Sequence, residues 1–236
     1  MKRTQKLSLI FVVAVAILSV GCWIGYEHFS RSYIQEYMLY NGVKVRRHLS
    51  SSTKNLDLYV EVSHRVNFLS EGNDKVMYDK ICEANGDVSY NQNVHLPLDV
   101  PTIMTSYPHI SKINVYSDKD FDANHPAGTS LNDVMTICYR SAIPYIESGY
   151  TADSLLLEEI VKPLNELGTD DLRMELSNVF LRFTKDPDEL STHVLTFECT
   201  NAEGNTYNAY YEYDFSLPEG KVETEVETEI IYKQPR

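Results

Sequence analysis

The sequence predicts a mainly β protein with minor helix, arranged as a two-sheet antiparallel β-sandwich behind an N-terminal signal or membrane anchor. Several segments alternate apolar and polar residues with a period of two, which is typical of half-buried strands. The chain has 17 Tyr and 43% hydrophobic residues, a composition that favours strands and excludes a disordered chain. About 210 residues follow the leader, enough for one compact domain.

The N-terminal segment 1–27 has the composition of a lipoprotein-type signal or membrane anchor. Three of its first six residues are basic, and an uncharged run then extends from Leu7 to Tyr26. A positive end followed by an apolar stretch directs export, and the positive end stays in the cytoplasm. We therefore expect residues 28–236 to lie outside the cytoplasm, in the cell envelope.

The leader leaves the form of attachment open. Gly21-Cys22 after a small and apolar tract resembles the bacterial lipobox, in which the cysteine is acylated and becomes the mature N-terminus. Cys22 is therefore the predicted lipid-attachment residue. A run of about 20 uncharged residues is also long enough to span a bilayer as an uncleaved helix. A soluble secreted form is the third alternative, but both anchored forms predict a membrane partner through the N-terminus.

Charge limits the partners of the exported part. Without the first 21 residues, Lys+Arg falls from 21 to 18 while Asp+Glu stays at 34, so the net charge changes from −13 to −16. Such a surface repels nucleic-acid phosphates, and no nucleic-acid partner is expected. An envelope protein or a glycan is the expected partner, and no motif predicts a cofactor.

Period-two alternation predicts strands over 55–69, 110–116 and 179–184. A hairpin is the strongest local prediction, because 193–200 and 207–215 alternate on either side of a five-residue loop that contains a glycine.

A last strand is predicted over 222–230, where β-branched residues alternate with four glutamates in the pattern of a charged edge strand. The mixed, basic segment 28–53 is expected to be a tether to a single mostly β extracytoplasmic domain over 54–236. Within this domain, 71–108 is rich in Asn, Asp, Gly and Pro and predicts long loops with short strands.

Two helical segments are predicted. Residues 130–133 (Ser-Leu-Asn-Asp) have the spacing of a capping box, so a short helix is expected to start at Ser130. Residues 151–167 place apolar side chains at three-and-four spacing after an N-cap candidate, Thr151. Pro163 requires this helix to kink or to end at the preceding residue.

An acidic loop carries the first candidate chemistry. Asp118, Asp120 and Asp122 offer oxygens at spacing two, which is how a calcium loop begins. Ala123 stands in the place of the turning glycine, and Thr129 stands in the place of the closing glutamate. We therefore expect weak calcium binding at most, and no metal site is assigned.

His125 lies close in sequence to these acids and to Ser130, so a Ser-His-Asp set is conceivable. An extracytoplasmic hydrolase that uses the 118–133 loop is therefore the alternative function. No nucleophile-elbow glycine pattern is present, and the other histidines lack paired metal-ligand spacing. No catalytic residue is assigned, and a non-enzymatic binding or structural module is the preferred prediction.

Tyrosines are candidates for stacking against a glycan or peptide, unless they pack inside a second layer of the sandwich. These candidates are Tyr59, Tyr90, Tyr107, Tyr116 and Tyr210.

Three cysteines follow the leader, Cys82, Cys138 and Cys199. They allow one disulfide plus a buried thiol, or three small buried thiols.

The sequence Asp-Lys-Asp-Phe-Asp-Ala-Asn-His-Pro-Ala-Gly-Thr-Ser-Leu-Asn-Asp at 118–133 resembles a segment of a family of predicted lipoproteins from gut Bacteroidales, a domain of unknown function. That family is similar in layout, with a lipoprotein-type leader and a C-terminal strand pair like 180–187 and 193–215. The resemblance implies an envelope location and a β fold. It implies no activity.

Overall fold

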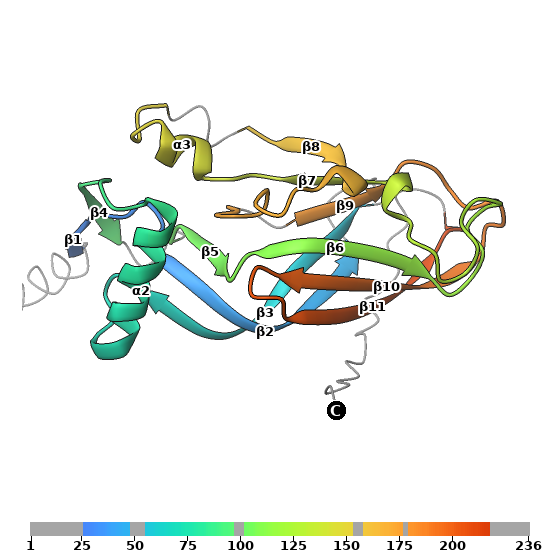
Figure 1. The fold of residues 1–236 in the computed structure, drawn as a ribbon, viewed down its shortest axis with the longest axis horizontal. Helices are drawn as coiled ribbons and strands as arrows, with labels where there is room; N and C mark the ends of the chain where they lie inside the picture. The colour runs from blue at the N-terminus through green and yellow to red at the C-terminus, as the bar shows by residue number, and fades with distance from the viewer. Residues whose placement is uncertain (1–25, 48–54, 97–101, 153–157, 177–178, 218–236) are drawn as a thin grey trace, which may run out of the picture.

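The computed structural model describes residues 26–47, 55–96, 102–152, 158–176 and 179–217 (Figure 1). With 47% strand and 15% helix, it confirms the mainly β class. Nearly all of the predicted leader, including Cys22, and the predicted strand over 222–230 lie outside the described residues. No helix in the part that is described is long and apolar enough to cross a membrane.

Eleven strands and four helical segments are described. In chain order they are β1 (Tyr26–Ser30), β2 (Glu36–Arg47), β3 (Leu56–Asn67), α2 (Gly72–Asn85), β4 (Gln92–Leu96), β5 (Met104–Tyr107), β6 (Ile110–Ser117), η1 (Asn132–Val134), β7 (Met135–Tyr139), α3 (Ile143–Glu147), β8 (Ile160–Pro163), η3 (Leu164–Glu166), β9 (Val179–Phe183), β10 (Thr192–Asn201) and β11 (Thr206–Asp214).

The strands form three sheets. β1 pairs with β4, a three-stranded sheet has the order β11-β10-β6, and a six-stranded sheet has the order β5-β2-β3-β9-β7-β8. β5 runs parallel to β2, whereas the other strand pairs of the described chain are antiparallel. The expectation of purely antiparallel pairing is therefore wrong at β5.

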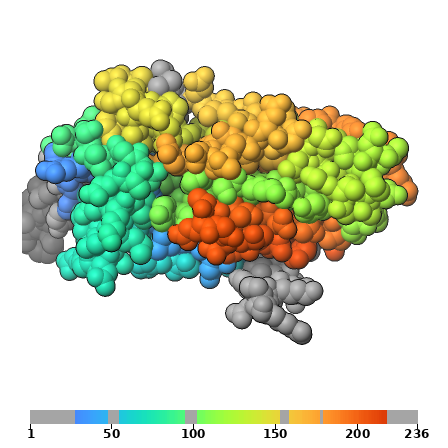
Figure 2. All heavy atoms as spheres, viewed as in Figure 1, coloured from blue at the N-terminus to red at the C-terminus, as the bar shows by residue number. Residues whose placement is uncertain are grey.

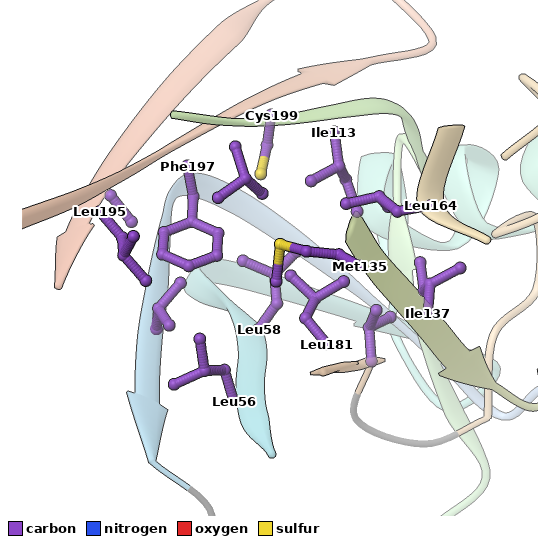
Figure 3. Close-up of a cluster of buried hydrophobic side chains, with 14 of the residues drawn as sticks. Leu56, Leu58, Ile113, Met135, Ile137, Leu164, Leu181, Leu195, Phe197 and Cys199 are labelled. Carbon is purple, nitrogen blue, oxygen red and sulfur yellow. The ribbon is translucent and has the colours of Figure 1, made fainter. Parts of the chain in front are cut away.

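The two larger sheets share one hydrophobic core (Figure 3). Leu195, Phe197 and Cys199 point inward from β10 at a spacing of two, as the sequence pattern predicts. The six-stranded sheet contributes aliphatic side chains such as Leu58 and Leu181 to the same core. Full burial of each such side chain stabilises the fold by about 1.5–3 kcal/mol.

A second cluster of buried side chains lies at the other end of β2 and β3, under α2 and α3. Tyr37, Tyr78 and Tyr145 are buried there together with Ile34 and Ile81. Figure 1 shows α2 beside β1 and β4 at one end of the molecule, with the loop after β6 at the opposite end.

Strands β3, β6 and β9 confirm the predictions over 55–69, 110–116 and 179–184. The predicted hairpin is confirmed by β10 and β11, which pair in continuous register from Thr192↔Asp214 to Thr200↔Thr206.

The prediction of a tether over 28–53 is wrong where the structure describes it, because β1 begins at Tyr26 and β2 is an interior strand of the six-stranded sheet. Irregular register around Gly42 breaks the period-two pattern that would have revealed β2. The basic residues of β2 pair with acids of β3. Lys44 Nζ lies 3.1 Å from Glu61 Oε1, and Arg46 Nε lies 3.3 Å from Asp57 Oδ2.

The prediction of long loops with short strands over 71–108 is wrong for residues 72–85, which form α2, whereas the short strands β4 and β5 do lie in this segment. Only Tyr78, Ile81 and Cys82 of this helix are buried, so its apolar stripe is too narrow to stand out in the sequence. Gly86 ends the helix in the left-handed region, at φ 71°. A glycine in this conformation is a common helix stop.

The prediction of a helix over 151–167 is wrong for the described residues of this segment. They form β8 and the single 3-10 turn η3 instead. Residues 153–157 lie outside the described part. Pro163 has no backbone N–H to donate, and it is accommodated because β8 is an edge strand that pairs only with β7. The helix predicted after Ser130 is reduced to the single 3-10 turn η1.

Candidate functional site

The loop over 118–131 leaves β6 at the end of the molecule opposite β1 (Figure 1). Its only large apolar residue before Leu131 is Phe121, which is completely buried. The Phe121 ring stacks on Phe183 with centroids 5.4 Å apart, and Phe215 approaches it edge-on at 5.8 Å. These contacts fix an otherwise polar loop to the core.

His125 is held between two carboxylates. Its Nδ1 lies 2.7 Å from Asp122 Oδ1, and its Nε2 lies 3.0 Å from Asp133 Oδ1. The hydrogen bond with Asp122 raises the pKa of His125, and Asp133 acts in the same direction. Since carboxylates accept and do not donate, both ring nitrogens carry protons when these bonds form, and the ring is then an imidazolium.

Lys185 adds a second cation to this cluster, because its Nζ donates to Asp122 Oδ2. That hydrogen bond, followed by the one from His125, holds the pKa of Asp122 well below its usual range. We call His125, Asp122, Asp133 and Lys185 the charge cluster. It ties the loop to η1 and to the turn after β9.

This arrangement does not assemble the conceivable Ser-His-Asp relay. A general base needs a free nitrogen lone pair directed at the nucleophile. His125 directs Nε2 at Asp133 instead. The Oγ of Ser130 accepts the backbone N–H of Asn132 at 3.3 Å.

The acids of the loop accept backbone hydrogen bonds. Asp118 Oδ1 accepts the N–H of Val194 at 2.8 Å, and Asp120 Oδ1 accepts the N–H of Ala127 at 2.8 Å. Asp122 is engaged in the charge cluster. Across the described ranges, no group of three or more His, Cys, Asp or Glu residues is placed to hold a metal ion.

A second Ser-His pair, which the sequence pattern did not reveal, lies where β6 meets the start of this loop. Ser117 Oγ and His193 Nδ1 are 2.8 Å apart. His193 is only 1% exposed and packs against Phe215 at 5.0 Å. Burial lowers its pKa, and Lys119 acts in the same direction. Because both side chains are buried, we interpret the pair as a link between the end of β6 and the start of β10.

The solvent-facing side of the sheet β6-β10-β11 carries a row of side chains that crosses the strands. In register, Tyr210 lies opposite Thr196, Thr196 lies opposite Tyr116, and Tyr116 bridges to Ser130. Directly opposite residues of antiparallel strands project from the same face. The residues on either side of Thr196, Leu195 and Phe197, are buried in the core, so this row faces outward. Tyr210 is 41% exposed.

A second row of this face, two residues further along β10, consists of amides and a carboxylate. Glu198 lies opposite both Asn208 and Asn114, and Asn114 Nδ2 donates to Glu198 Oε1 at 3.1 Å. Tyr116 and Tyr210 are two strand spacings apart, about 10 Å. We call these two rows the outer face. Figure 2 shows the β10–β11 hairpin at the surface turned toward the viewer.

The other predicted tyrosines pack against neighbours. Tyr59 lies under the Arg46 guanidinium at 5.1 Å, Tyr107 contacts Tyr37 at 6.2 Å, and Tyr90 contacts Tyr33 at 5.3 Å. Only Tyr116 and Tyr210 of the five share an outward row. The outer face is therefore the candidate functional site.

The three cysteines after the leader are free thiols. Cys82 and Cys199 are buried, and Cys138 is half-buried. Burial raises the pKa of Cys199 to about 12, which leaves its thiol protonated and unreactive at neutral pH.

Comparison of the chain with protein-family models, with curated proteins and with solved structures finds no match. The resemblance of the 118–133 segment to the Bacteroidales lipoproteins stays a prediction.

Proposed function

We propose that this chain is an exported, membrane-anchored envelope protein in which a β-sandwich of the two larger sheets presents the outer face to a neutral glycan. It acts by binding and not by catalysis. The row Tyr210, Thr196 and Tyr116 is the observation that carries this proposal. The anchor is the 1–27 leader, attached either by acylation of Cys22 or as an uncleaved helix.

The chemistry of the outer face suits a ligand rich in hydroxyl groups. Tyrosine rings supply rigid apolar contact area at low entropic cost, and Asn, Ser and Thr supply adaptable hydrogen bonds. The core of a protein–protein interface is depleted of charged residues, whereas Glu198 lies centrally in this face. The negative charge of the exported part disfavours acidic polysaccharides, so we infer a neutral glycan.

The hydrolase alternative receives little support from the charge cluster. It requires His125 to leave Asp133 and to approach a hydroxyl nucleophile. A hydrolase would also need an open cleft at the loop, with acids available to a substrate. The loop acids Asp118 and Asp120 already accept backbone hydrogen bonds.

A glycan array probed with the full chain and with Tyr210→Ala tests the proposal. We expect at least a tenfold loss of affinity, because removal of an aromatic side chain that contacts the ligand costs more than about 1.4 kcal/mol. Tyr59→Ala is the matched control, since this tyrosine lies outside the outer face, and it should bind as the unaltered chain does.

Two outcomes would contradict the proposal. One is the absence of any glycan hit together with capture of an envelope protein that does not depend on Tyr210. The other is turnover of a generic ester or peptide substrate, with loss of turnover in His125→Ala.

A further inference from the structure

We propose that the end of the molecule formed by β1, β4 and α2 lies against the bilayer surface, with Phe29, Leu69, Val76 and Met77 in contact with the membrane interface. This inference rests on the proposed membrane anchoring, and it identifies the face of the domain that contacts the membrane.

The predicted anchor lies only a few residues from the first strand of the fold. The uncharged run of the leader extends to Tyr26, and β1 begins at that same residue. If Cys22 carries the lipid, the four residues from Cys22 to Tyr26 span at most about 14 Å. Either form of anchor therefore holds β1 next to the headgroups, because no long tether intervenes.

Exposed apolar side chains are concentrated at this end of the molecule. Eight large hydrophobic side chains are exposed in the described ranges, and five of them come from β1 or from the segment 69–88. These five are Phe29, Leu69, Val76, Met77 and Val88. Figure 1 places β1 and α2 together at one end of the molecule, far from the loop after β6.

Phe29 is directed away from the domain. Its neighbours in β1 face inward, since Ser30 is buried and the His28 ring packs edge-on against Phe68 at 6.1 Å. Successive side chains of a strand point to opposite faces, so Phe29 projects from the far side of the β1–β4 ribbon. It is 59% exposed.

α2 presents a similar outward side. Its buried residues Tyr78, Ile81 and Cys82 define the core-facing stripe. Val76 lies two residues before Tyr78, on the opposite side of the helix, and is 52% exposed. Lys80, Asp79 and Glu83 are exposed on the same helix side, so the apolar side chains there stand among charged residues of both signs.

The experiment uses tryptophan fluorescence in vesicles that contain brominated phosphatidylcholine. The full chain is purified from membranes in detergent and reconstituted, in a Trp23→Phe background that removes the single native tryptophan. Phe29→Trp and Val76→Trp report on the proposed contact. Leu190→Trp is the matched control, because Leu190 is 55% exposed and its loop hydrogen-bonds Phe121 at the opposite end.

We expect brominated lipid to quench the tryptophan at 29 and at 76 several-fold more strongly than at 190. Equal, weak quenching at all three positions in chains that float with the vesicles would overturn this inference while leaving the anchor intact. Chains that fail to float with the vesicles would refute the anchor itself, and the membrane-facing end with it.

Discussion

Glu175 should make the stability of this protein depend on pH. Its carboxylate accepts hydrogen bonds from Thr105 Oγ1 at 2.8 Å, from Ser106 Oγ at 2.7 Å and from the Ser106 N–H at 3.2 Å. These three donors favour the ionised form and lower the pKa. Burial favours the neutral form and outweighs them, so the pKa of Glu175 is raised from 4.5 to about 7.

The sign of the effect follows from linkage. A carboxyl group whose pKa is higher in the folded state binds its proton more tightly when folded. Its contribution to stability is therefore complete below about pH 4.5 and is lost as the pH rises through about 7. At about 1.4 kcal/mol per pKa unit, the difference between 4.5 and about 7 corresponds to an upper limit of about 3 kcal/mol.

Urea unfolding of the unaltered chain and of Glu175→Gln at pH values from 4.5 to 8 measures this contribution. We expect the unaltered chain to lose up to about 3 kcal/mol relative to the variant across this range. His125 also has a raised pKa and contributes in the same direction, but it is common to both proteins and cancels in the comparison. Parallel stability curves for the two proteins would show that burial does not raise the pKa of Glu175 in the folded state.

Three further tests of the packing use urea unfolding at pH 7. Asp87 accepts hydrogen bonds from two buried backbone N–H groups and from the Tyr150 hydroxyl. Asp87→Ala should therefore lower the free energy of unfolding by about 3–5 kcal/mol, and Tyr150→Phe, which removes only one of these bonds, by about 1 kcal/mol. Equal losses would show that the two backbone hydrogen bonds add nothing to stability. Phe121→Ala should lower the free energy of unfolding by about 3–5 kcal/mol, and the control Leu190→Ala by less than about 0.5 kcal/mol. Equally small losses would show that the aromatic contact of Phe121 does not fix the loop. Gly204→Ala, at φ 86°, should cost about 1 kcal/mol, and an unchanged unfolding midpoint would argue against the left-handed turn.

Many of the strands could be predicted because the apolar residues of their alternating pattern are the same residues that the tertiary structure buries. In β10, the inward apolar residues Leu195, Phe197 and Cys199 meet the core shared with the six-stranded sheet. In the segment 151–167 they disagree. The apolar residues have helical spacing, but Val161 pairs with Cys138 of β7, because an unpaired sheet edge was available to the chain.

The candidate site was predictable only in part. Alternation along 207–215 places Tyr210 on the opposite side of the strand from Ala209, which is buried, and so predicts its exposure. That Tyr116 lies in the same row depends on the register between β6 and β10, which joins residues about 80 positions apart. Sequence spacing could not predict Asp133 as the second partner of His125 either, since η1 brings it there.

The amino-acid sequence by itself determined the mainly β class, the hairpin at 193–215 and the export-type composition of 1–27, because each depends on the order of neighbouring side chains. Tertiary structure alone decided that β2 is an interior strand and that Tyr116, Thr196 and Tyr210 form one row. These features depend on hydrogen bonds and packing between segments far apart in the chain, and local propensity is too weak to predict such contacts.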